Sequence, residues 1–149
     1  MQRIRFLVRY WLPVLLWMGV IFSASSDSHS AAHSSRIIAP VVRWLWPDLS
    51  EEGVYGVVLL VRKCGHVAEY ALLALLLWRG LHGRAKRPWR WSEAGLALGL
   101  TALYAASDEF HQTFVPSRQG SPWDVLLDTS SAALALLCLW GIGRWRKWW

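Results

Sequence analysis

Apolar residues are concentrated in four long runs, and polar connectors separate these runs along the chain. The runs cover positions 6–24, 57–78, 92–108 and 125–142. A helix needs about 20 mostly apolar residues to cross the hydrocarbon core of a bilayer. Stretches such as LALLLW have no polar face, whereas a surface helix of a soluble protein keeps one. The pattern predicts an all-α fold, specifically an integral membrane four-helix bundle.

A cleaved signal peptide is the alternative interpretation of the first run. Arg3 and Arg5 form a basic start, and Ser23, Ala24 and Ser25 are small residues of the kind found at cleavage sites. The apolar run is long for a signal peptide, however, and three more runs follow it. We therefore interpret positions 6–24 as a membrane span.

Length and composition favour a single domain over residues 1–149. The chain is 54% hydrophobic and contains 12 Trp, which excludes a disordered chain because disorder requires low hydrophobicity and few aromatics. Its 2 Cys are too few for a disulfide scaffold. The net charge of +6 leaves a nucleic-acid-binding protein open until the positions of the charges are considered.

The charged residues are distributed unequally between the two sides of the predicted bundle. The two termini and the segment 79–93 carry 11 basic residues and 1 acidic residue (net +10), whereas the opposite side carries 5 basic and 9 acidic residues (net −4). Basic residues collect on the cytoplasmic side of membrane proteins. We therefore expect a multi-pass protein of the cytoplasmic (inner) membrane with both termini in the cytoplasm. Its basic excess would contact the lipid bilayer, and we expect no nucleic-acid partner.

Most Trp residues lie near the predicted ends of the spans. Trp is enriched at membrane–water interfaces because its ring is apolar and its N–H is polar. We expect anchors on the cytoplasmic side at Trp78, Trp89, Trp91, Trp140, Trp145, Trp148 and Trp149, and on the outer side at Trp44, Trp46 and Trp123.

The connectors contain further helix signals. The long outer connector, from about 25 to 56, has a polar start and then an apolar segment with two Arg at 36–46, which predicts a short interfacial helix. We expect this connector to fold over the outer ends of the spans as a lid. Asp48 with Glu51 resembles a capping box, which predicts a helix that starts there and continues into the second span.

Two other local signals concern the third and fourth spans. Gly95 and Gly99 are four residues apart, a spacing that allows close helix packing within the bundle. Ser121 followed by Pro122 predicts the start of the fourth helix, because Ser is a favoured N-cap and Pro is tolerated in the first turn.

Polar residues interrupt the last three runs at one predicted level, the outer end of the bundle. In each run they recur three or four residues apart and so share one helical face. We call this set the polar cluster and expect it to bind a ligand: Lys63, His66, Glu69, Tyr70, Asp108, Glu109, Gln112, Arg118, Asp124 and Asp128.

Several interpretations of the polar cluster stay open at this point. A charge facing lipid costs roughly 3 kcal/mol even on lenient scales, so these side chains should converge and pair inside the bundle. They form either a salt-bridge network that only holds the helices together, or a site. The acid–base candidates of such a site are His66, Glu69, Asp108 and Glu109.

Metal binding and anion binding are two further interpretations of the polar cluster. Carboxylates with imidazoles suit a divalent metal, but their spacing matches no known zinc or calcium motif, so we expect no metal and no other cofactor. Arg118 and Lys63 would suit a phosphate or carboxylate group of a ligand.

Two segments of the chain resemble the VanZ-like family of small bacterial membrane proteins. They are RKCGHVAEYALLALLL at 62–77 and SDEFHQTFVPSRQGSPWDVLLDTSSAAL at 107–134, and the first span ends in a similar FSASSD. The resemblance implies that the polar cluster corresponds to the family's polar positions. Two departures are Ser117, where the family commonly has Gly, and small residues at 130–132 in place of a Gly-rich stretch.

The resemblance also implies a functional context, because the founding member of the family is associated with low-level resistance to the glycopeptide teicoplanin. We expect an outward-facing pocket that binds a cell-envelope, lipid-headgroup, lipid-linked or glycopeptide ligand. The alternative is a membrane enzyme that acts on such a substrate by carboxylate and His acid–base chemistry. A transporter is disfavoured because the cytoplasmic halves of the spans are nearly free of charge. The sequence leaves open whether a reaction occurs and what the oligomeric state is.

Overall fold

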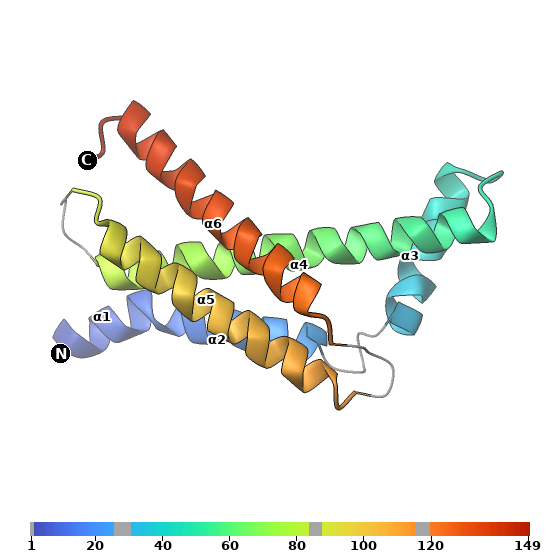
Figure 1. Cartoon of the computed structure of the whole chain (residues 1–149), viewed down its shortest axis with the longest axis horizontal. Helices are drawn as coiled ribbons and strands as arrows, with labels where there is room; N and C mark the ends of the chain where they lie inside the picture. The colour runs from blue at the N-terminus through green and yellow to red at the C-terminus, as the bar shows by residue number, and fades with distance from the viewer. Residues whose placement is uncertain (1, 26–30, 84–87, 116–119) are drawn as a thin grey trace.

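The computed structural model describes residues 2–25, 31–83, 88–115 and 120–149, with the backbone only for 31–34. This part of the chain is all-helical, as predicted, and contains no strand. In chain order the helices are α1 Gln2–Tyr10, α2 Leu12–Ser25, α3 Ala31–Leu45, α4 Glu51–His82, α5 Trp91–Gln112 and α6 Pro122–Trp145 (Figure 1).

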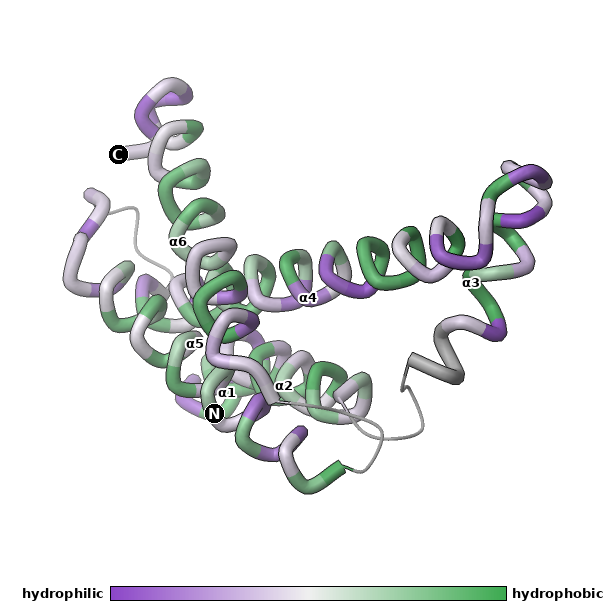
Figure 2. The backbone as a smooth tube through the Cα atoms, turned by 45° about the vertical axis from the view of Figure 1, so that its right-hand side comes forward, coloured by the Kyte–Doolittle hydropathy of each residue, from purple (hydrophilic) through white to green (hydrophobic). Residues whose placement is uncertain are grey.

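Helices α1 and α2 form one nearly continuous rod. The N–H of Trp11 donates to the carbonyl of Leu7, and the N–H of Leu15 donates to the carbonyl of Trp11. The ladder is interrupted next to Pro13, which has no N–H to donate. This rod (Gln2–Ser25) and α6 are both long and apolar enough to cross a membrane, judged by length and composition. Hydrophilic positions interrupt α4, the helix of another predicted span (Figure 2).

Helix α4 is the central element and contacts each of the other helices. The two chain termini lie at the same end of the molecule, together with the end of α4 and the start of α5 (Figure 1). With 32 residues, α4 is about 48 Å long at 1.5 Å per residue. Its first half extends beyond α2, α5 and α6, and α3 packs beside it (Figure 1).

The helix predicted at 36–46 exists as part of α3, but its predicted position as a lid is wrong. Among the described elements α3 contacts only α4. Val42, Val54 and Val58 are buried, and Arg43 pairs with Glu51 where α4 begins. Arg43 lowers the pKa of the Glu51 carboxyl, mainly through the hydrogen bond that it donates and also through its positive charge.

The two predicted helix starts differ in their capping. Helix α4 does begin next to the predicted capping box, but its N-cap is Ser50 and not Asp48: the Ser50 hydroxyl accepts the N–H of Gly53 at 3.2 Å. The Glu51 carboxylate pairs with Arg43 and is not part of a capping box. Helix α6 begins at Pro122 after Ser121, as predicted, although the Ser121 side chain makes no capping hydrogen bond.

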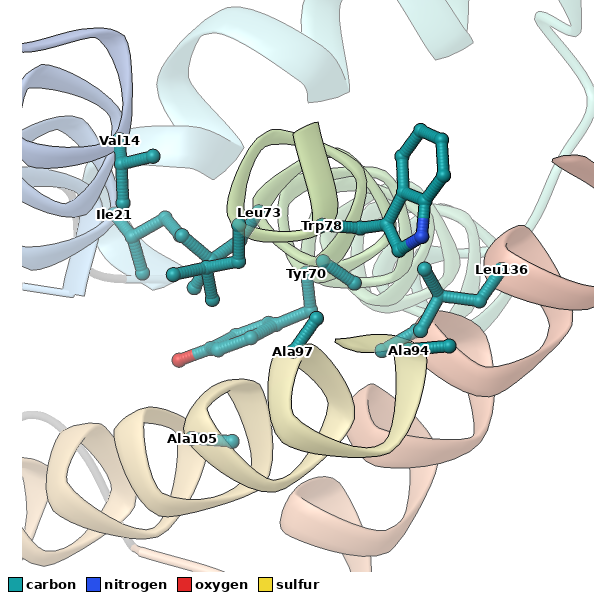
Figure 3. Close-up of a cluster of buried hydrophobic side chains, with 12 residues drawn as sticks. Val14, Ile21, Tyr70, Leu73, Trp78, Ala94, Ala97, Ala105 and Leu136 are labelled. Carbon is teal, nitrogen blue, oxygen red and sulfur yellow. The ribbon is translucent and has the colours of Figure 1, made fainter. Parts of the chain in front are cut away.

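The apolar core lies where α2, α4, α5 and α6 meet. Figure 3 shows Ile21 of α2 and Leu73 of α4 close together, with Ala97 of α5 and Leu136 of α6 on the other sides of α4. The small side chains Ala97, Thr101 and Ala105 are fully buried. Small residues on this face of α5 allow its backbone to approach α4 closely.

Close packing within the chain does not use the glycine pair predicted for it. Gly95 and Gly99 are exposed, and a Cβ added at either position would meet no atom within 4 Å. Helix α5 is rotated about its own axis so that its alanine face packs against the neighbouring helices. The face that carries Gly95 and Gly99 points away from them.

Several Trp residues predicted as interfacial anchors contact one another in an aromatic cluster. The ring of Trp78 stacks on His82 and on Trp89, with centroids 4.6 and 4.9 Å apart, and Trp149 lies 5.3 Å from Trp89. Trp78 is only 8% exposed. His82 in turn approaches Glu93, with 2.7 Å between Nδ1 and Oε2. These contacts join the end of α4, the start of α5 and the C-terminal segment.

Replacing Trp17 with Phe should destabilise the contact between α2 and α4. The indole N–H of Trp17 donates to the backbone carbonyl of Glu69 at 2.9 Å, and Phe keeps an aromatic ring, although a smaller one, but lacks this donor. We expect the free energy of unfolding in detergent micelles to fall by about 1 kcal/mol, the usual contribution of one hydrogen bond. Trp44→Phe is the control, since Trp44 is 79% exposed; equal losses in both variants would contradict the assignment.

Candidate functional site

A buried carboxylate, Asp108, joins three helices at the end of the core. Its Oδ2 accepts hydrogen bonds from the Ser25 hydroxyl at 2.6 Å, the Tyr70 hydroxyl at 3.2 Å and the Gln112 amide at 3.0 Å. Asp108 is 3% exposed. Such bonds to a charged acceptor are stronger than neutral ones, so they hold the ends of α2 and α5 to the middle of α4.

A second group of side chains lies beside Asp108. His66 of α4, Glu109 of α5 and Asp128 of α6 each offer one nitrogen or oxygen atom, and these atoms all lie within 4.8 Å of one another. Within the group, His66 Nδ1 is 3.9 Å from Asp128 Oδ2. Three consecutive helices therefore bring three groups that can transfer a proton or bind a metal to one point.

Asp128 is the most deeply buried member of this group. It has an exposed fraction of 0%, and neither of its carboxylate oxygens accepts a hydrogen bond from a described residue. The same holds for Oδ1 of Asp108. Buried polar atoms are nearly always hydrogen-bonded in proteins, so these oxygens are exceptional among the described residues.

The segment before α6 positions Glu109. The backbone N–H of Ser121 donates to Glu109 Oε2 at 2.8 Å. Gly120 makes this approach possible, because a Cβ at that position would lie 2.4 Å from the carbonyl oxygen of Glu109. The sequence contains a Gly-Ser-Pro turn at 120–122. Only the fold shows that this turn contacts Glu109.

The remaining predicted residues lie around this centre or outside the described chain. Lys63 pairs with Asp124 at 2.5 Å, and its side chain is 55% exposed. This ion pair therefore lies at the solvent-exposed rim of the polar cluster. Glu69 lies within electrostatic reach of Asp128. Arg118 belongs to residues 116–119, outside the described residues.

Two of the described ion pairs join α4 to α6, through Lys63 with Asp124 and through His66 with Asp128. Asp108 and Asp128 have no Lys or Arg partner among the residues that the structure describes. A cluster built only to hold helices together would pair its buried charges, because an unpaired buried charge is costly. Asp108 and Asp128 therefore differ from the members of such a network.

A mostly apolar cleft opens next to Glu109, between the end of α5 and the start of α6. Its volume is about 370 Å³. Phe110, Pro122 and Val125 supply much of the apolar lining, and Thr113 and Ser121 add two polar residues. The cleft thus connects one member of the acidic group with an apolar surface.

Sequence reasoning missed Ser25 as a member of this site. It stands in the Ser-rich end of the first apolar run, where it is one of several equivalent candidates. Ser25 is 1% exposed and bonded to Asp108. Only the packing of α2 against α4 and α5 distinguishes it from its neighbours.

The fold and the buried acidic cluster define a small all-helical protein. Two of its described helices are long and apolar enough to cross a membrane. The model of the VanZ/LLP1 family matches residues 10–144, and the chain belongs to this family. The match includes every helix that contributes to the polar cluster, in agreement with the resemblance seen in the sequence. No curated protein and no solved structure matched the chain.

Replacing Ser25 with Ala should destabilise the protein by about 2 kcal/mol, because hydrogen bonds to charged groups contribute about 1.5–3 kcal/mol. The free energy of unfolding in detergent micelles measures this loss. Ser107→Ala is the matched control, since Ser107 is exposed and its hydroxyl donates only to the Tyr104 carbonyl one turn earlier. A neutral Ser25→Ala variant would show that Asp108 does not need this donor.

Proposed function

We propose that the chain is a multi-pass protein of the bacterial cytoplasmic membrane whose polar cluster faces outward and binds the headgroup of a lipid or lipid-linked cell-envelope ligand. The observation that carries this proposal is the position of the buried acidic group beside an apolar cleft. This arrangement fits an amphiphilic molecule. Hydrogen-bond donors on its headgroup would meet the carboxylates, and its apolar part would lie in the cleft.

The membrane part of the proposal is supported by the outer surface of the helices. Large apolar side chains such as Leu15, Leu103 and Leu134 are more than 60% exposed, and contiguous apolar surface needs a partner. The end that holds both termini also carries the basic residues Arg3, Arg5, Arg9, Arg144 and Arg146. By the positive-inside rule this end faces the cytoplasm.

Cysteine accessibility tests this orientation in whole cells. Cys64 and Cys138 are first replaced by Ala, because both are exposed; Thr113→Cys and Ser92→Cys then mark opposite ends of α5. A membrane-impermeant maleimide should label the variant at 113 and leave the one at 92 unlabelled until the cells are lysed. The reverse pattern would place the polar cluster on the cytoplasmic side and overturn the proposal.

The ligand part is tested by filling the cleft. Val125→Trp puts a bulky ring into the lining of the cleft, whereas Leu134→Trp changes the same helix at a position that is 63% exposed. Native mass spectrometry of the purified protein with phosphatidylglycerol or phosphatidylethanolamine, whose headgroups carry hydrogen-bond donors, should show at least tenfold less bound lipid for Val125→Trp. Equal retention by both variants would mean that lipid binds elsewhere.

A membrane enzyme is the second candidate, and the convergence of His66, Glu109 and Asp128 favours it. An imidazole beside carboxylates is suited to general acid–base catalysis. The same mass spectra separate the two candidates: an enzyme produces a new lipid mass over time that Asp128→Asn abolishes, whereas a binding protein leaves the lipid mass unchanged. Growth of an expressing host on teicoplanin tests the proposed link to glycopeptide resistance independently of either.

A further inference from the structure

The group formed by His66, Glu109 and Asp128 has the geometry of an incomplete coordination sphere. One ligand atom from each residue lies within 4.8 Å of the other two. Atoms bound to one metal ion at about 2.0–2.2 Å lie about 3–3.5 Å from one another. The observed separations, up to 4.8 Å, are wider than this, so the His66 and Glu109 side chains must move toward Asp128 to bind an ion. Asp128, whose side chain is 1% exposed, is the fixed member.

The buried carboxylates leave acceptor positions that a cation would satisfy. Both oxygens of Asp128 lack a hydrogen-bond donor among the described residues, and Oδ2 points toward the imidazole of His66. Asp108, Glu109, Asp124 and Glu69 add further negative charge within electrostatic reach of Asp128. Lys63 is engaged by Asp124 at the rim. A cation that enters the centre of the group satisfies the oxygens that the protein leaves bare.

The ligand types select the class of ion. One imidazole and two carboxylates suit a first-row divalent ion such as Zn²⁺ or Mn²⁺. Ca²⁺ is disfavoured because it needs six to eight oxygen ligands, and three protein ligands with one nitrogen fall short. The Ser121 N–H that holds Glu109 Oε2 acts as the supporting contact that oriented ligands usually have.

We infer that the protein binds one divalent transition-metal ion between α4, α5 and α6, held by His66, Glu109 and Asp128. Three protein ligands leave coordination positions open, and the cleft that begins at Glu109 lies next to them. The inference rests on this geometry and does not require the proposed function. The sequence spacing predicted no metal because the three residues come from three separate helices.

Metal content of the purified full chain tests this inference. The protein in detergent, without an affinity tag, is stripped with EDTA, incubated with Zn²⁺ or Mn²⁺, desalted and analysed by elemental mass spectrometry. We expect about one ion per chain in the wild type, and less than a tenth of that in Asp128→Asn and His66→Gln. Asp124→Asn is the matched control, because Asp124 lies one turn from Asp128 on α6 but pairs with Lys63; it should retain the ion.

Thermal unfolding shows whether the variants are folded and whether the ion acts at this site. Asp128→Asn removes an unpaired buried charge, so the metal-free variant should melt at or above the wild-type temperature. Added Zn²⁺ or Mn²⁺ should raise the melting temperature of the wild type and Asp124→Asn but not that of Asp128→Asn. Wild-type protein without bound metal, or Asp128→Asn with wild-type metal content, would overturn the inference. Lipid retention measured in EDTA tests the proposed function separately.

Discussion

The hydrogen bonds to the buried Asp108 carboxylate are the interaction on which this end of the molecule depends. Ser25, Tyr70 and Gln112 all donate to one oxygen, so α2 and α4 can rotate or slide relative to α5 only by breaking a bond to a charged acceptor. In a low-dielectric interior such a bond is stronger and a lost partner is more costly. This constraint sets which face of each helix points inward, and it places Glu109, the next residue, toward α6.

The same arrangement leaves one buried carboxylate, Asp128, without a Lys or Arg partner among the described residues. A buried ion pair is seldom more stable than well-packed apolar residues of similar size. Ionisable residues inside apolar helices usually mark a functional site. The fold bears their cost because the rest of the interface, from Ile21 and Leu73 to the alanines of α5, is closely packed.

Packing at the other end follows a different principle. There the aromatic rings of Trp78, Trp89 and Trp149 stack on one another and on His82, and Arg79 lies over the ring of Tyr10. Aromatic contacts of this kind depend on ring geometry but need no buried charge. The molecule therefore combines an end stabilised by aromatic packing with an end that holds polar chemistry, and α4 connects the two.

The sequence by itself determined the all-helical class, most helix positions, the family and the segments in which polar residues interrupt the apolar runs. These features are readable because apolar length, turn residues and polar interruptions are local properties of the chain. The tertiary structure alone decided that Ser25 and Trp17 bond to α5 and α4, that Gly95 and Gly99 face outward, and that α3 lies along α4. It also divided the polar cluster into the Asp108 network and the group of His66, Glu109 and Asp128. Each of these outcomes depends on the rotation of a helix about its axis and on the identity of its neighbours, which periodicity along one segment does not specify.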